Sequence, residues 1–209
     1  MKLEKITLGY FAVNCYIVSL KDLNILIDPG ADFDRLQKFL ISNNIKPDII
    51  INTHGHYDHI GAVPDLMQEY RIGFYIDREE EQVVTDPEMN CSSIFSQNTL
   101  SLNAYNLISS ADKKYFDSFG ISIIKTPGHT PGSITIKISN MLFTGDLLFR
   151  GAIGRTDLPG GSLYDIKISL LKLKTLNKEF EIFPGHGPGS NLETELETNP
   201  YLGNDFLGK

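Results

Sequence analysis

The five histidines of this 209-residue chain are the residues whose positions point most directly to chemistry. Three of them, His54, His56 and His59, stand in the segment THGHYDHIG, and the other two are His129 in TPGHTPGS and His186 in PGHG. Each lies near a glycine in a segment that follows an apolar stretch. Loops that follow strands are where open sheets place their ligand sites. The histidines are therefore predicted to lie at strand ends and not in the core.

The densest group consists of His54, His56, Asp58 and His59. Its spacing of i, i+2, i+4 and i+5 fits neither one face of a helix nor one face of a strand. A sharp turn, with Gly55 relieving backbone crowding, would bring all four side chains around one point. Protonated imidazoles would repel one another there, whereas a divalent cation takes neutral imidazole nitrogens and ionised carboxylates. The group is interpreted as metal-binding, and a polar surface loop is the alternative.

Three further candidate ligands follow separate apolar segments: His129, Asp146 in Thr-Gly-Asp, and His186. Alone, His129 fits a rigid turn and Asp146 fits a helix cap, but together with the first group they make seven candidate ligands. A zinc site with an open position uses three protein ligands, so seven are too many for one ion. The set predicts a dinuclear hydrolytic site whose two ions share one carboxylate and one hydroxide. Nitrogen and oxygen donors suit zinc, and manganese and iron also fit.

Composition limits the possible partners. The chain has 19 basic and 26 acidic residues, a net charge of −7, which argues against binding to nucleic acid or anionic lipid. The amino-terminal segment is interpreted as a strand and not a signal peptide, and no apolar run approaches the roughly 20 residues of a membrane helix. We expect a cytoplasmic protein with a small-molecule substrate. Cys15 and Cys91 are expected to be reduced, buried thiols. The sequence does not indicate an oligomeric state.

One α/β domain, residues 1–209, is predicted to position these loops. The predicted strands are Asn14–Ser19, Asn24–Ile27, Asp48–Asn52, Gly73–Ile76, Ile121–Lys125, Ser133–Ile138 and Met141–Thr144. The predicted helices are Asp34–Asn43, Ala62–Tyr70 and Ser162–Leu176, and residues 85–116 are expected to contain a helical excursion. In Ser133–Ile138 the alternation of isoleucine with Ser, Thr and Lys predicts an antiparallel strand with one solvated face.

The ordered motifs Thr-His-x-His-x-Asp-His, Pro-Gly-His-Thr, Gly-Asp and Gly-His resemble those of the metallo-β-lactamase fold superfamily. The resemblance covers nearly the whole chain, from Asp28-Pro29-Gly30 to the PGHG motif. It implies a four-layer αββα sandwich with two metals at the edge of its sheets. It assigns one metal to His54, His56 and His129, and the other to Asp58, His59 and His186, with Asp146 bridging them. It also implies that Asp28 supports the metal-binding histidines from behind.

Within that superfamily the chain is most similar to the glyoxalase II group, the hydroxyacylglutathione hydrolases, in their short bacterial form. The likeness lies in Gly145–Gly161 and in Asn14-Cys15-Tyr16. It implies that a hydroxide held by two metals attacks a thioester. Asp58 and Asp146 are the predicted catalytic residues, because they would position this hydroxide. Arg150 and Arg155 are predicted to bind a substrate carboxylate; a solvated loop charge or an internal salt bridge is the alternative. The helical carboxyl-terminal domain of the full-length enzymes has no counterpart in the residues after PGHG, which leaves glutathione selectivity open.

Other functions compete with this one. Persulfide dioxygenases share the Gly-Arg-Thr-Asp stretch but use a single iron, and lactone hydrolysis needs the same kind of metal site. The commonest lactamases lack a histidine at the position of His59 and have a cysteine at that of Asp146, which argues against antibiotic hydrolysis. The net charge of −7 argues against an RNA-processing nuclease. The presence of all seven candidate ligands argues against a non-enzymatic interaction module.

Overall fold

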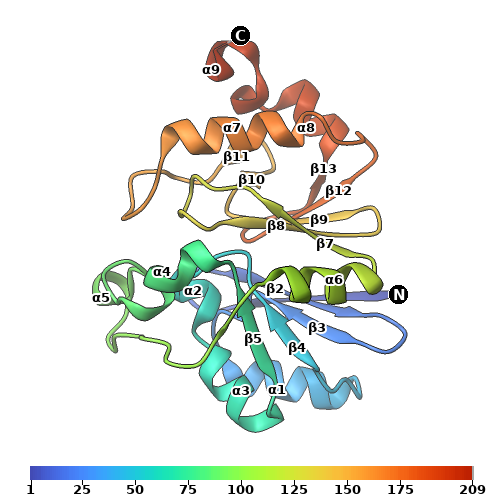
Figure 1. Cartoon of the computed structure of the whole chain (residues 1–209), viewed down its shortest axis with the longest axis vertical. Coiled ribbons are helices and arrows are strands. Elements are labelled where there is room, and N and C mark those ends of the chain that lie inside the picture. The colour runs from blue at the N-terminus through green and yellow to red at the C-terminus, as the bar shows by residue number, and fades with distance from the viewer. Residues whose placement is uncertain (209) are drawn as a thin grey trace. The chain divides into compact units, whose positions relative to one another are not determined.

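A computed structural model describes residues 1–208, which fall into two compact units, one of residues 1–108 and one of the described residues from Ser109 onward. Each unit contains one larger β-sheet with helices packed against it (Figure 1). A separate two-stranded sheet belongs to the second unit.

The sheet of the first unit has six strands in chain order. They are β1 (Lys2–Leu8), β2 (Val13–Ser19), β3 (Asn24–Ile27), β4 (Ile49–Ile51), β5 (Gly73–Ile76) and β6 (Asn106–Leu107). The first three pair antiparallel, and β3 to β6 pair parallel. A parallel succession needs crossovers, and helices supply them: α1 (Phe33–Ser42) joins β3 to β4, and α3 (Val63–Tyr70) precedes β5.

The apolar faces of α1 and α3 pack into the core of the first unit. Leu36 and Leu40 of α1 and Leu66 of α3 are fully buried, and they belong to one cluster with Cys15 and Phe74 of the sheet. These helices lie along the same face of the sheet in Figure 1. The i, i+4 spacing of the two leucines of α1 gives the apolar stripe that such packing requires.

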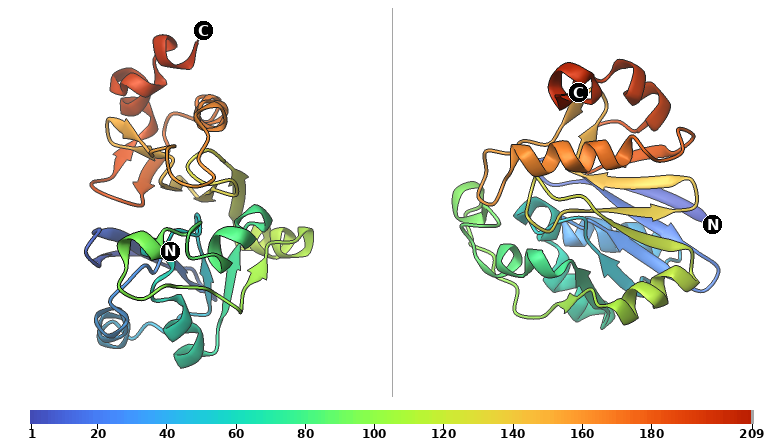
Figure 2. Two further views of the ribbon diagram at one scale, coloured as in Figure 1. Left: turned by 90° about the vertical axis from the view of Figure 1, so that its left-hand side faces the viewer. Right: turned by 45° about the horizontal axis from the view of Figure 1, so that its top comes forward.

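Short helices also lie in the connections that follow β4 and β5. They are α2 (Tyr57–Ile60), the 3₁₀ helix η1 (Arg78–Glu80), α4 (Glu81–Thr85) and α5 (Ser92–Phe95). The helical excursion expected within residues 85–116 is confirmed by α5 and by α6 (Ser110–Ser118) of the second unit, with β6 between them. Figure 2 shows these short helices from two further directions.

The sheet of the second unit has the order β13-β12-β9-β8-β7. Its strands are β7 (Ile121–Lys125), β8 (Ile134–Ile138), β9 (Met141–Gly145), β12 (Glu181–Pro184) and β13 (Ser190–Asn191), and only β9 and β12 pair parallel. Strands β10 (Leu148–Phe149) and β11 (Ala152–Ile153) form the small hairpin. The helices after β11 are α7 (Leu163–Leu173), α8 (Leu192–Thr198), η2 (Pro200–Leu202) and α9 (Asn204–Leu207).

The carboxyl-terminal segment is part of the core of the second unit. Leu192, Leu202 and Leu207 are buried in one cluster with Ile166 and Leu170 of α7. The few apolar residues of this polar segment are therefore the ones that face inward.

The predicted strands and helices are confirmed to within a few residues at their ends, but one expectation about β8 is wrong. Thr135 was assigned to a solvated face, yet it is fully buried and its hydroxyl lies 3.1 Å from that of Thr126. A threonine can be buried on a strand when another hydroxyl group forms a hydrogen bond with its own. The alternation of apolar and polar residues therefore did not show that the face of β8 that carries Thr135 is buried. The antiparallel pairing of β8 is as predicted.

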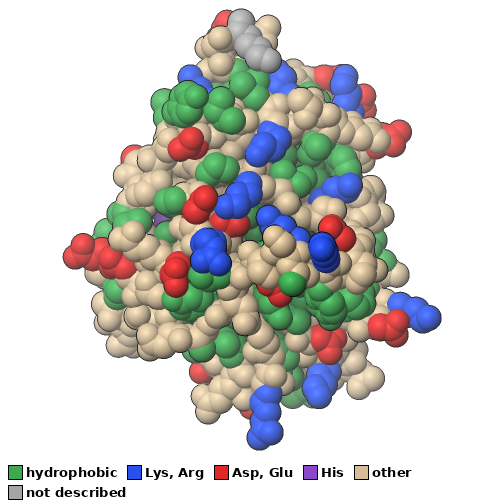
Figure 3. All heavy atoms as spheres, in the orientation of Figure 1, with side chains coloured by type: hydrophobic (Ala, Val, Ile, Leu, Met, Phe, Trp, Pro, Cys, Tyr) green, Lys and Arg blue, Asp and Glu red, His purple; other side chains and the backbone are tan. Residues whose placement is uncertain are grey.

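Both cysteines are free and buried, as predicted. Burial, together with the nearby Asp28 carboxylate, raises the pKa of the Cys15 thiol well above its ordinary value. Among the helices of the described residues, none has the length and apolar character needed to cross a membrane. On the face drawn in Figure 3, basic and acidic side chains are interspersed with neutral ones.

Candidate metal centre

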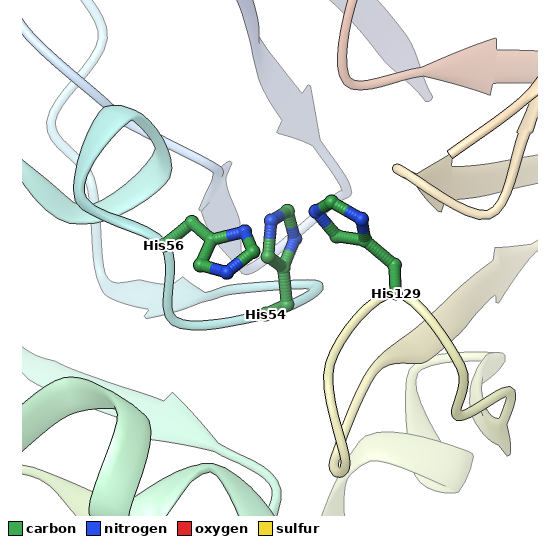
Figure 4. A group of neighbouring side chains, drawn as sticks. All are labelled: His54, His56 and His129. Carbon is green, nitrogen blue, oxygen red and sulfur yellow. The ribbon is translucent and has the colours of Figure 1, made fainter. Parts of the chain in front are cut away.

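Most candidate ligands lie shortly after the carboxyl end of a strand, as the sequence predicted, whereas Asp58 and His59 belong to the short helix that follows β4. His54 follows β4, which ends at Ile51, and His129 follows β7, which ends at Lys125. Asp146 is the first residue after β9, and His186 comes two residues after β12. Figure 4 shows His54 and His56 on one loop and His129 on the loop between β7 and β8. Strand ends thus present these side chains, although the ligands are far apart in sequence.

The first unit brings four candidate ligands together. His56 is the residue before α2, and Asp58 and His59 belong to that helix, so the turn after β4 continues directly into a helical turn. The His54 ring centroid lies 4.9 Å from that of His56 and 4.0 Å from that of His59. The Asp58 Oδ2 lies 3.9 Å from His59 Nε2. The three rings are buried, so their charged forms would be costly to crowd together without a compensating ion.

Asp28 supports this group, as the resemblance implied. Its carboxylate accepts hydrogen bonds from the backbone N–H of Thr53 at 2.8 Å and from the Thr53 hydroxyl at 2.7 Å. Because that hydroxyl donates to Asp28, it accepts from Nδ1 of His54, 3.1 Å away. The proton of the neutral His54 ring is thereby assigned to Nδ1, which leaves Nε2 as the metal-binding atom. The other ring near Asp28 is that of His59, whose Nδ1 lies 3.1 Å from Oδ2.

A buried acid that the sequence analysis missed holds the same loop. Glu80, with no exposed surface, accepts a 2.7 Å hydrogen bond from the backbone N–H of Gly55, between two candidate ligands. A Cβ at Gly55 would lie 2.8 Å from Val84, so this position needs glycine. Glu80 stands within a run of charged residues, 78–81, where nothing in the sequence distinguishes the buried acid from its exposed neighbours.

The second unit brings the other three candidate ligands together around Asp146. Its Oδ2 lies 3.5 Å from Nε2 of His129 and 3.7 Å from Nε2 of His186. The backbone carbonyl of Arg155 lies 2.8 Å from Nδ1 of His129. A carbonyl can only accept, so Nδ1 carries the proton and Nε2 the lone pair. The backbone at Gly154 packs closely against that of Asp146, because a Cβ at Gly154 would lie 1.7 Å from the Asp146 carbonyl oxygen.

The structure gives the guanidinium of Arg155 a partner of its own. It pairs with both carboxylate oxygens of Asp157, at 2.6 and 2.7 Å, which is the internal salt bridge considered as the alternative to substrate binding. The hydrogen bond from Arg155 lowers the pKa of Asp157 to about 2. Arg150 is exposed in the turn between β10 and β11. For both arginines, contact with a substrate stays a prediction.

The chemistry of the donors fits a divalent metal. In each unit the set consists of imidazole nitrogens and carboxylate oxygens, and neither includes a thiolate. All seven residues belong to groups of side chains that could hold a metal ion. Two of the histidines have their ring protons placed on Nδ1 by protein acceptors, the arrangement that metal-binding histidines commonly show.

This chain belongs to the metallo-β-lactamase superfamily, whose family model matches residues 8–186. The fold is of that superfamily's mixed α/β type, and the chain is a metal-dependent hydrolase of this fold.

Among its relatives is the hydroxyacylglutathione hydrolase GloC of Haemophilus influenzae, which is 31% identical over 209 residues, covering 97% of this chain and 98% of GloC. Two solved structures are also similar. The B3 metallo-β-lactamase BLEG-1 has a TM-score of 0.88 at 32% identity, covering 96% of this chain and 99% of BLEG-1. The protein TTHA1623, solved in a di-iron-bound form, has a TM-score of 0.86 at 30% identity, covering 95% of this chain and all of its own.

Proposed function

We propose that this protein hydrolyses small-molecule thioesters with the help of two divalent metal ions. The observation that carries the proposal is the likeness to GloC, named a hydroxyacylglutathione hydrolase, over nearly the full length of both chains. The candidate ligands support it, because carboxylates and neutral imidazoles suit the ions that hydrolytic sites use. We propose zinc as the metal. Iron is the alternative, favoured by the di-iron form of TTHA1623.

The proposed ligands are the seven residues of the two sets. We assign His54, His56 and His129 to one ion, Asp58, His59 and His186 to the other, and Asp146 to both. When bound, divalent ions lower the pKa of water toward neutrality and polarise a carbonyl oxygen. The chain must then orient its ligands and hold the reacting water. It must also keep the imidazole protons off the nitrogen atoms that bind metal.

The orientation of the ligands comes from residues behind them. Thr53 keeps the proton of His54 on Nδ1, and the Arg155 carbonyl does the same for His129. The Asp146 Oδ2 lies within 3.7 Å of the Nε2 atoms of both His129 and His186. As a carboxylate beside these two candidate ligands, Asp146 can accept a hydrogen bond from the attacking water. We propose Asp58 and Asp146 as the catalytic residues that position this water for attack on the thioester carbonyl.

The test is steady-state hydrolysis of S-D-lactoylglutathione by zinc-loaded protein, with a chelated sample as the blank. We expect turnover that disappears on chelation and returns when zinc is restored. No turnover of this ester or of other thioesters, in protein shown to contain two equivalents of metal, would overturn the proposal.

A second candidate function is β-lactam hydrolysis, favoured by the 32% identity with BLEG-1. The same metal-loaded sample should be assayed with a chromogenic cephalosporin beside the thioester. A kcat/KM for the cephalosporin well above that for the thioester would reverse the order of the two candidates. Measurement of iron content and oxygen uptake tests the remaining competitor, a persulfide dioxygenase with a single iron.

A further inference from the structure

One buried carboxylate in the carboxyl-terminal segment of the second unit lies outside the proposed ligand sets. Glu195 belongs to α8 and is 1% exposed, whereas Glu193 and Glu197 on the same helix are exposed. Burial of a charged group is costly unless hydrogen bonds compensate for the lost water. The hydrogen bonds of Glu195 therefore indicate what this residue does.

Glu195 joins two segments that follow candidate ligands. Its Oε2 accepts a hydrogen bond from the backbone N–H of Gly151 at 2.8 Å, in the turn between β10 and β11. Its Oε1 accepts one from the Ser190 hydroxyl at 2.5 Å, at the start of β13. The β10–β11 hairpin begins two residues after Asp146, and β13 begins four residues after His186. One carboxylate thus holds the chain beyond both ligands.

Asn199, the residue that follows α8, is also buried and reinforces this contact. Its Nδ2 lies 2.8 Å from Glu195 Oε2, 3.3 Å from the Phe149 carbonyl oxygen and 3.2 Å from that of Ala152. Its Oδ1 accepts from the backbone N–H of Tyr201 at 3.0 Å, which assigns the amide orientation and leaves Nδ2 facing the hairpin. Both strands of the hairpin and its turn are therefore bound by one buried pair of side chains (Figure 1).

The hairpin needs such support, because its own pairing is short. Each of its strands has two residues, and an isolated two-stranded hairpin is at best marginally stable in water. The Thr144 hydroxyl holds the base of the hairpin by donating to the Leu148 carbonyl at 2.9 Å. Glu195 and Asn199 hold its turn and its second strand. The position of the hairpin is therefore set by contacts outside it.

The hairpin lies next to all three candidate ligands of the second unit. Asp146 stands two residues before it in the chain. The carbonyl of Arg155, two residues after β11, faces Nδ1 of His129 at 2.8 Å. The ring centroid of Phe149 lies 6.3 Å from that of His186, in edge-to-face geometry. A shift of the hairpin would therefore displace a neighbour of each ligand.

We propose that Glu195 and Asn199 are positioning residues for the metal centre. Through the hairpin they fix the carbonyl group that faces His129, and the Ser190 hydroxyl extends this hold to the segment that follows His186. This inference rests on the ligands assigned in the proposed function, and it gives the carboxyl-terminal segment a role although that segment contributes no ligand. Ligands that are oriented before the ion arrives lose less entropy on binding, so the metal binds more tightly.

The first experiment measures zinc affinity by competition with a chromogenic chelator, on folded protein well below its unfolding temperature. Glu195→Ala should bind zinc about tenfold more weakly than the unmodified protein. This is the lower end of the loss found for groups that orient metal ligands, because Glu195 acts through intervening groups. Glu195→Gln should recover most of the affinity, because its amide oxygen can accept from Gly151 while its amide N–H donates to the Ser190 oxygen. The exposed Glu193→Ala is the control and should bind zinc as the unmodified protein does.

A matched variant separates positioning from a loss of stability. Leu196 is the next residue of α8, and its side chain is partly buried against the core of the second unit. Leu196→Ala should lower the free energy of unfolding, measured by urea denaturation, but leave zinc affinity unchanged. An equal loss of zinc affinity in Leu196→Ala and Glu195→Ala, or none in Glu195→Ala, would overturn the inference and leave the proposed function standing.

The second experiment needs no metal. Long-range proton–nitrogen NMR of isotope-labelled apo protein, at a pH where the rings are neutral, reports the tautomer of each histidine. His129 should carry its proton on Nδ1 in the unmodified protein and lose this single tautomer in Glu195→Ala. His54, whose ring faces the Thr53 hydroxyl in the first unit, should keep its tautomer in both proteins. Failure of the unmodified protein to bind zinc would refute the proposed function, and an unchanged His129 tautomer in Glu195→Ala would then overturn this inference as well.

Discussion

At the scale of single residues, one buried acid serves two candidate ligands. Asp28 reaches His54 through the Thr53 hydroxyl and lies 3.1 Å from Nδ1 of His59. Such supporting partners fix the orientation of metal-binding rings and raise their basicity. The substitution of Asp28 therefore tests the geometry behind the ligands without removing any of them.

We expect Asp28→Asn to weaken metal binding by about 10–100-fold, because the amide supplies a weaker acceptor for the Thr53 hydroxyl. Metal affinity is measured by competition with a chromogenic chelator. The matched control is Asp22→Asn, an exposed acid, which should bind metal as the unmodified protein does. Equal affinities for the two variants would show that Asp28 does not tune the ligands.

Glu80 provides the second test at this scale. Removal of its carboxylate in Glu80→Ala leaves the buried N–H of Gly55 without its acceptor, which costs about 1–3 kcal/mol in the free energy of unfolding. Glu80→Gln keeps an acceptor oxygen and should recover most of this loss. Urea denaturation measures both, with the exposed Glu79→Ala as control. A Gln variant as unstable as the Ala variant would contradict this role.

The carboxylate of Asp58 and the guanidinium of Arg155 are expected to differ sharply in importance. Loss of a metal ligand in Asp58→Ala should lower kcat/KM for the thioester by more than about 100-fold. Arg155→Ala removes an exposed ion pair, which contributes little because solvent screens it, but keeps the backbone carbonyl that lies beside Nδ1 of His129. Its loss should stay below about tenfold. Comparable losses would count against both assignments.

At the scale of elements, α7 positions the loop that carries His129. Ser162, the residue before this helix, donates its backbone N–H to the Gly128 carbonyl at 2.8 Å, and Ser169 donates its hydroxyl to the Pro127 carbonyl at 2.7 Å. Gly128 has a φ of 137°, and a Cβ there would lie 2.3 Å from the backbone nitrogen of Ile166. The glycine of the Pro-Gly-His motif is therefore required by close packing against the helix as well as by its backbone angle.

The amino terminus of α6 gives a prediction about acid stability. Ser109 and Asp112 form a capping box, and the hydrogen bonds from Ser109 lower the pKa of the Asp112 carboxyl below its ordinary value of 3.8. A carboxyl whose pKa is lower in the folded state stabilises the fold fully above the unfolded pKa, and this contribution is lost as the pH falls through the folded value. Ser109→Ala should lower the free energy of unfolding by about 1 kcal/mol at pH 7.

The measurement is urea denaturation of Ser109→Ala and of the unmodified protein at pH 7 and near pH 3. The difference between them should be larger at pH 7, because protonation of Asp112 weakens the box in the unmodified protein. Ser118→Ala, at the carboxyl end of the same helix, controls for loss of a serine hydroxyl elsewhere on α6. If the difference in the free energy of unfolding were larger near pH 3 than at pH 7, the pKa of Asp112 would not be lowered in the folded protein.

At the scale of the whole molecule, strand-end loops could be predicted because local signals agreed with one another. The runs before His54 and His129 are rich in isoleucine, the run before Asp146 is Met-Leu-Phe-Thr, and a glycine stands within four residues of the end of each. Their motifs also stand in the order typical of the superfamily, so the fold class followed from the sequence. Strands β4 and β9 end shortly before His54 and Asp146, at the positions in the chain that the sequence indicated.

What the sequence did not predict depends on contacts between distant segments. The burial of Glu80 follows from a hydrogen bond to Gly55, 25 residues away, and the solvated face assigned to β8 failed because Thr126 covers Thr135. Local composition records neither of these pairings, because each residue type involved is common on ordinary surfaces.

Metal removal is the prediction that concerns the whole chain. The proposed ligands come from both halves of the sequence. An ion that binds only the folded protein stabilises it by mass action, by about 4 kcal/mol when free metal is a thousandfold above Kd. For a chain of this length that corresponds to a rise of about 8–16 °C in Tm. Calorimetry of apo and zinc-loaded protein should show this shift, and His56→Ala and His186→Ala should each reduce it. If only the first variant reduced the shift, the ligands of the second unit would not share in the stabilising metal, and the assignment of all seven residues to one dinuclear centre would be wrong.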